Sequence, residues 1–110
     1  MTKTLSKSRI AELEQAHADT LAQLASARDA ICLHMSHSNA RDLLLRYANE
    51  MCAGAPCVDV VSQYRERANG AVDMLREQGF ITEKAWCEIR NVLMFTASAA
   101  RDEVTVRIGN

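Results

Sequence analysis

The sequence contains few proline, glycine and aromatic residues. Its 110 residues include one proline, four glycines, one tryptophan, two tyrosines and two phenylalanines. Sheet-rich domains need many turns, and turns draw heavily on glycine and proline. The hydrophobic share of 48% is also too high for a disordered chain. The composition therefore predicts a single all-α domain spanning residues 1–110, with a core filled by aliphatic side chains and alanines.

The chain also lacks an excess of charge of either sign. It carries 13 basic and 14 acidic residues, for a formal net charge of −1. Non-specific nucleic-acid binders carry a basic excess, and a DNA mimic would be strongly acidic. The charge balance therefore argues against a nucleic-acid partner and favours another protein or protein complex. Ten of the basic residues are arginines, the side chain enriched at protein interfaces.

No long hydrophobic run is present. The N-terminal residues lack the apolar stretch of a secretory signal, and no window approaches 18 apolar residues. We therefore expect a cytoplasmic protein without a membrane partner. Cysteines stay reduced in that compartment, so we expect four free thiols. They are Cys32, Cys52, Cys57 and Cys87.

Apolar spacing predicts four helices. The first should begin near Ser6 or Ser8 and end near His34, after frayed residues 1–7. The second should span about 39–53, capped by Ser38 or Asn39 and ended by Gly54. The third should start near Pro56 and run to about Gln78, and the fourth should run from Thr82 to about Arg101. Gly70 lies inside the third helix between Ala68 and Ala71, which favours close approach of another helix.

A heptad-like seam runs along the first helix. The second helix is too short to cover this seam, and the fourth is apolar on almost every side around Val92, Met94 and Phe95. Uncovered apolar faces point to a partner. We therefore expect either a homodimer or a foreign protein on these surfaces. The seam consists of Ile10, Leu13, His17, Thr20, Leu24, Ala27, Ile31 and His34.

The most sharply defined turn lies between the third and fourth helices. Gly79 suits the left-handed residue just past a helix end, and Thr82 suits the N-cap of the next helix. Ile81 and Trp86 have the spacing of a hydrophobic staple. By contrast, residues 104–108 alternate with period two and are rich in β-branched residues, so residues 104–110 should form a short extended arm or strand.

Residues that could carry chemistry are few. Cys32, His34 and His37 resemble a fragment of a zinc site, which Cys52 and Cys57 would have to complete. The spacing of Cys52 and Cys57 crosses a helix end, and Cys32 and His34 point to different helix faces. Cys57 falls in the first turn of the third helix, where the helix dipole favours a thiolate, but no histidine is near it in sequence.

Paired carboxylates are also present, at Glu12/Glu14, Glu83/Glu88 and Asp102/Glu103, and they fit solvated helix faces. We therefore expect a non-enzymatic protein, with no catalytic residue, no cofactor and no metal.

Five basic residues could form a partner-binding surface around the helical hairpin. They are Arg65, Arg67, Arg76, Lys84 and Arg90. The same hairpin could be read as a DNA-binding helix-turn-helix, whose second helix needs exposed polar residues at its N-terminus. Here that helix opens with Glu83-Lys84-Ala85-Trp86, which is poorly suited to a DNA groove.

Residues 75–82 resemble the Leu-x3-Gly-x-Ile-Thr turn of many bacterial helical hairpins, a resemblance that implies no activity. The build of the chain is also similar to that of small accessory proteins of phages and mobile elements, many of which inhibit host complexes. We expect a four-helix bundle with a C-terminal arm. Its expected function is that of a protein-binding regulator, an inhibitor or adaptor that occludes a partner surface. The alternatives are a dimeric DNA-binding regulator and a zinc- or thiol-dependent protein.

Overall fold

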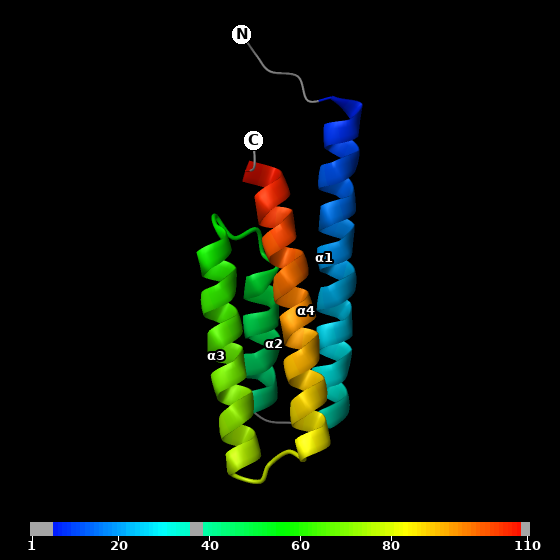
Figure 1. Cartoon of the computed structure of the whole chain (residues 1–110). Helices are drawn as coiled ribbons and strands as arrows, with labels where there is room; N and C mark the ends of the chain where they lie inside the picture. The colour runs from blue at the N-terminus through cyan, green and yellow to red at the C-terminus, as the bar shows by residue number, and fades with distance from the viewer. Residues whose placement is uncertain (1–5, 36–38, 109–110) are drawn as a thin grey trace.

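The computed structural model describes residues 6–35 and 39–108. It contains α1 (Lys7–His34), α2 (Asn39–Met51), α3 (Val58–Glu77) and α4 (Glu83–Ile108), and the described residues include no strand. Successive helices run in opposite directions (Figure 1). The predicted four-helix bundle is therefore confirmed.

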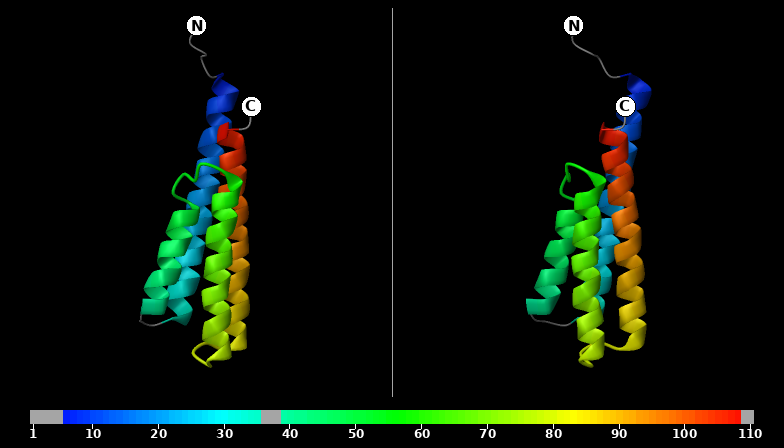
Figure 2. Two further views of the ribbon diagram at one scale, coloured as in Figure 1. Left: turned by 90° about the vertical axis from the view of Figure 1, so that its left-hand side faces the viewer. Right: turned by 60° about the vertical axis from the view of Figure 1, so that its left-hand side comes forward.

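The helices differ greatly in length, and this decides what is covered. α1 has 28 residues and α4 has 26, so both are about 40 Å long, whereas the 13 residues of α2 span only about 20 Å. α1 packs most extensively on α4, α4 on α3 and α3 on α2, and α1 packs less on α2. Figure 2 shows α1 and α4 extending past the connection between α2 and α3.

Two buried threonines join α1 to α4. The Thr20 hydroxyl donates to the carbonyl of Ala99 at 3.3 Å, and the Thr96 hydroxyl donates to the carbonyl of Gln23 at 3.2 Å. Each hydroxyl also bonds the carbonyl four residues earlier in its own helix. A threonine side chain is short, so these bonds require the two backbones to lie close together. Two of the accepting carbonyls belong to alanines, Ala16 and Ala99, whose small side chains leave room for this approach.

The start of α1 follows the prediction. Ser6 is its N-cap, and the Ser6 hydroxyl accepts a hydrogen bond from the backbone N–H of Arg9 at 3.1 Å. Such a bond satisfies one of the backbone donors that a helix leaves free at its beginning. α2 begins with Asn39. The proposed cap at Ser38 and residues 1–5 lie outside the described residues.

The end of α3 is closed as predicted. Gly79 has a φ of +77°, the left-handed conformation that glycine adopts without strain. The N–H of Phe80 donates to the carbonyl of Leu75 at 2.9 Å, and the N–H of Gly79 donates to that of Arg76 at 3.0 Å. This pair of bonds is the Schellman motif, which satisfies carbonyls at the helix end.

The start of α4 is also as predicted. The hydroxyl of Thr82 accepts from the N–H of Ala85 at 3.1 Å, so Thr82 is the N-cap. Ile81 and Trp86 both pack against the core, as the staple spacing requires. The chain is therefore held at both ends of this turn by local hydrogen bonds to backbone groups.

The predicted extended arm at residues 104–108 is wrong, because α4 continues to Ile108 instead of ending near Arg101. Each β-branched residue in a helix costs only a few tenths of a kcal/mol of stability relative to alanine. Continuing the helix buries Val104 to 2% exposure. It also lets the Arg9 guanidinium donate to the carbonyls of Val106 and Arg107 at the helix end. Residues 109–110 lie outside the described range.

Two further details of α3 differ from expectation. Gly70 is exposed, and a Cβ built on it would meet no heavy atom within 4 Å, so the expected close approach of another helix is wrong. Pro56 is not the first helical residue, since α3 begins at Val58 with Cys57 as its N-cap. Gly54 follows the end of α2 with a φ of +77°, as predicted.

Candidate protein-binding site

Two of the five predicted basic residues flank the hairpin tryptophan. The Arg76 guanidinium carbon lies 3.9 Å from the Trp86 ring centroid, and that of Arg90 lies 5.4 Å from it. Asp73 accepts from the Trp86 indole nitrogen at 2.7 Å and from Arg90 Nη1 at 2.9 Å. This cluster joins α3 to α4, so Arg76 and Arg90 help to stabilise the hairpin itself.

The Asp73 carboxylate is stabilised by its partners. The hydrogen bond from the Trp86 indole, with those from Arg90 and the nearby positive charges of Arg90 and Arg76, lowers the pKa of Asp73 below its ordinary 3.8. Asp73 is therefore ionised at neutral pH. Its interactions are a structural feature of the α3–α4 contact.

Among the described residues, Arg65, Arg67 and Lys84 make no hydrogen bond or ion pair with the Trp86 cluster, and two carboxylates pair with basic residues near the hairpin. Arg67 lies over the ring of Tyr64, 5.3 Å from its centroid, and Arg65 is half-buried on α3. Lys84 pairs with Glu88 at 4.0 Å, and Arg76 pairs with Glu83 at 3.7 Å. Much of the positive charge around the hairpin is therefore matched by carboxylates. Partner binding by these five residues stays a prediction.

The residues considered for zinc are divided between the two ends of the bundle. Cys32 and His34 lie near the end of α1, while Cys52 and Cys57 flank the connection from α2 to α3 at the opposite end (Figure 1). His34 pairs with the carboxylate of Glu88 across the α1–α4 contact, and His37 lies outside the described residues. Within residues 6–35 and 39–108, no three His, Cys, Asp or Glu side chains are placed to share a metal ion.

The cysteines at the α2–α3 connection differ in their surroundings. Burial, with a smaller effect from the Glu103 carboxylate, raises the pKa of the Cys52 thiol to about 11. Very little thiolate forms there at neutral pH, so Cys52 is a poor nucleophile. Cys57 is the N-cap of α3 and makes no capping hydrogen bond through its side chain. It therefore lies just before the first turn in which the sequence had placed it.

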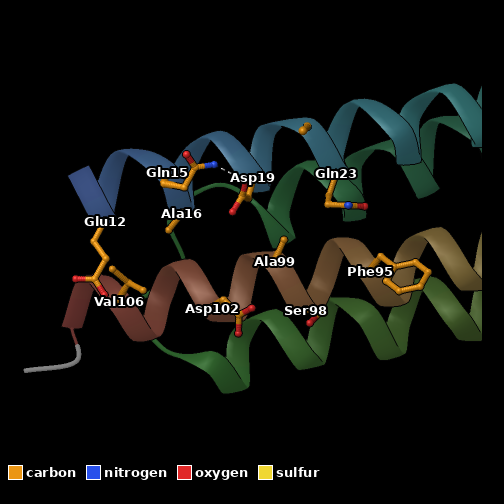
Figure 3. Close-up of a pocket in the computed structure, with 11 residues that line it drawn as sticks. Glu12, Gln15, Ala16, Asp19, Gln23, Phe95, Ser98, Ala99, Asp102 and Val106 are labelled. Carbon is orange, nitrogen blue, oxygen red and sulfur yellow. Dashed lines mark hydrogen bonds between the residues drawn. The ribbon is translucent and has the colours of Figure 1, made fainter. Parts of the chain in front are cut away.

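A groove of about 530 Å³ lies between α1 and α4. Figure 3 shows its α1 wall, from Glu12 to Gln23, facing its α4 wall, from Phe95 to Val106. None of its lining residues comes from α2 or α3. The lining residues are Glu12, Gln15, Ala16, Asp19, Ala22, Gln23, Phe95, Ser98, Ala99, Asp102 and Val106.

The groove is acidic and contains an exposed aromatic ring. Its lining includes three carboxylates, Glu12, Asp19 and Asp102, and no basic side chain. Two of them have local contacts: Glu12 lies 3.8 Å from Arg9, and Asp19 accepts a hydrogen bond from Gln15 at 2.8 Å. The Phe95 side chain is 56% exposed. The groove thus combines negative charge with an apolar contact point, and it suits a positively charged ligand with an apolar side.

Sequence reasoning missed this groove because its two walls lie about 80 residues apart in the chain. Phe95 was recognisable as an apolar residue on the outside of an apolar helix. Asp102 and Asp19, by contrast, look like ordinary charges on two separate helices. Only the antiparallel packing of α1 on α4 places them along one groove (Figure 3).

Comparison with known proteins gives no relative from which a function could be transferred. No protein-family model matches the chain, and no curated protein or solved structure matches it either. Across residues 6–35 and 39–108, none of the helices combines the length and the hydropathy that crossing a lipid bilayer requires.

Proposed function

We propose that this chain is a small protein-binding regulator of the cytoplasm, an inhibitor or adaptor without chemistry of its own. It binds a partner protein through the groove between α1 and α4 and occludes the surface that it covers. The observation that carries this proposal is the groove itself, with three carboxylates, no basic lining residue and the exposed ring of Phe95.

The chemistry of the groove indicates the kind of segment that it binds. A cleft between two antiparallel helices accepts a third helix, which places apolar residues inward at helical spacing. A matching helix would carry lysine or arginine opposite Asp19 and Asp102 and an apolar residue against Phe95. Complementary charge raises the rate of association and selects among partners. A basic amphipathic helix of another protein is therefore the ligand that the groove fits best.

The test compares what co-purifies with the tagged wild-type chain and with variants from the native cell. Phe95→Ala and Asp102→Lys change exposed groove residues and should leave the helical circular dichroism unchanged. We expect each to weaken binding of the wild-type partner by about tenfold, or about 1.4 kcal/mol, because each changes a central contact of the proposed interface. Met94→Ala is the matched control, because Met94 is 45% exposed on α4 and does not line the groove.

The same experiment tests two of the five basic residues around the hairpin, Arg65 and Arg67. A double variant, Arg65→Glu with Arg67→Glu, reverses charge on α3 away from the groove. A partner that is retained by the groove variants but lost from this double variant would overturn the groove assignment. It would favour binding at the hairpin surface.

A further inference from the structure

A second surface of α1 lies outside both the core and the groove. The predicted heptad seam is buried in the bundle at Thr20, Ala27 and Ile31. The side of α1 that carries Ile10 and Leu21 is open, since these residues are 42% and 49% exposed. A shallow hollow of about 340 Å³ surrounds Leu21, and it is lined by Leu21, Leu24, Ala25, Arg28 and Asp29.

Five exposed residues form one line along this side of α1, here called the α1 stripe: Ile10, Glu14, Leu21, Arg28 and Cys32. Glu14, Leu21 and Arg28 follow each other at intervals of seven residues, which is close to two helical turns. Ile10 and Cys32 add one turn at each end. The stripe therefore alternates apolar and charged side chains along about 33 Å of helix.

The α1 stripe is complementary to itself when its direction is reversed. Leu21 is its midpoint, Glu14 lies seven residues before it and Arg28 seven residues after it. Reversing the helix about Leu21 places an acidic residue opposite a basic one at both positions and an apolar residue opposite an apolar one at both ends. Within the described part of the chain, neither Glu14 nor Arg28 has an oppositely charged partner within 4 Å.

From this pattern we infer that the protein forms a homodimer in which the α1 helices of two copies pack antiparallel about a two-fold axis at Leu21. Leu21 then packs on the partner subunit's Leu21, and Glu14 pairs with Arg28 of the partner subunit. The two-fold axis makes the second Glu14–Arg28 pair identical to the first. A parallel arrangement would instead place Glu14 on Glu14 and Arg28 on Arg28, and this like-charge repulsion selects the antiparallel one.

The dimer surface and the groove lie on opposite sides of α1. Asp19 and Leu21 are two residues apart, a rotation of about 200° around the helix axis. A dimer formed through the α1 stripe therefore leaves the groove of each copy open. The inference does not depend on the proposed function, and the two are tested by different measurements.

Sedimentation velocity over a range of concentrations tests the dimer with the full-length chain. We expect a mass near twice 12.2 kDa for the wild type. Glu14→Arg and Arg28→Glu should each raise the dimer dissociation constant by about tenfold, because each creates like-charge contacts at both symmetric positions. The double variant, Glu14→Arg with Arg28→Glu, should recover most of the wild-type affinity. Asp19→Arg is the control, since it reverses one charge on the opposite side of α1.

Disulfide trapping tests the register separately. In a background with Cys32→Ser and Cys87→Ser, the Leu21→Cys variant should form a covalent dimer under mild oxidation, because the two new thiols meet at the axis. Ala22→Cys, turned by about 100° towards the groove, should not. A mass that stays at 12.2 kDa up to millimolar concentration would overturn the inference. So would a dimer that ignores the charge reversals at Glu14 and Arg28.

Discussion

The Asp73 carboxylate on α3 accepts hydrogen bonds from two side chains of α4, the indole of Trp86 and the guanidinium of Arg90. These bonds favour its ionised form and hold its pKa below the ordinary 3.8. A group whose pKa is lowered on folding stabilises the fold at pH values above its unfolded pKa. That stabilisation is lost as the pH falls through the lower, folded pKa.

We therefore expect Asp73→Asn to lower the free energy of unfolding at pH 7, by no more than about 1 kcal/mol because the ion pair is partly exposed. The difference from the wild type should shrink below about pH 4, where the unfolded carboxyl protonates and then the folded one. Urea unfolding between neutral and acidic pH measures this. Glu66→Gln is the control, since Glu66 is exposed on α3. A constant difference at all pH values would contradict the role given to the Asp73 charge.

At the scale of the element, substitution by alanine should have opposite effects on stability at the two glycines in and after α3. Gly70 is an exposed residue inside the helix with open space around it, whereas Gly79 has a φ of +77°. We expect Gly70→Ala to raise the free energy of unfolding by about 1 kcal/mol. Gly79→Ala should lower it by a similar amount, because alanine is strained at positive φ. Chemical denaturation of the two variants measures the signs, and equal signs would rule out this account of the turn.

The Thr82 cap makes a separate prediction for α4. Thr82→Ala removes the oxygen that accepts from the N–H of Ala85, and loss of such a cap costs about 1 kcal/mol. Thermal unfolding should show a lower midpoint than the wild type. Thr82→Ser retains the oxygen and should restore most of the loss. If the serine variant melts like the alanine variant, the hydroxyl is not responsible.

At the scale of the whole molecule, close packing of the bundle depends on small buried residues. Ala97 is fully buried in the core, and helical spacing places it on the side of α4 that carries Trp86 and Arg90, which contact Asp73 on α3. We expect Ala97→Leu to cost about 1–3 kcal/mol or more, because overfilling a packed core forces helices apart. Ala11→Leu, on the exposed surface of α1, should change stability by less than about 0.5 kcal/mol. Calorimetry of the two variants provides the comparison.

The sequence by itself determined where most helices begin and end. Ser6, Gly79 and Thr82 act through hydrogen bonds to backbone atoms no more than a few residues away, so local spacing was sufficient to predict them. The apolar spacing also predicted the four helices themselves. These features are local, or repeat with the period of a single helix.

Only the tertiary structure decided the features that depend on distant partners. Residues 104–108 read as an arm because their local pattern is β-branched, but burial of Val104 and the contacts of Arg9 make them helical. The groove exists because α1 and α4 pack antiparallel, which brings Asp19 and Asp102 to one cleft. The predicted seam shares only Ile10 with the α1 stripe, because the packing of α1 on α4 and α2 decides which side of α1 stays exposed. Each outcome depends on which helices meet, and spacing within one helix does not specify that.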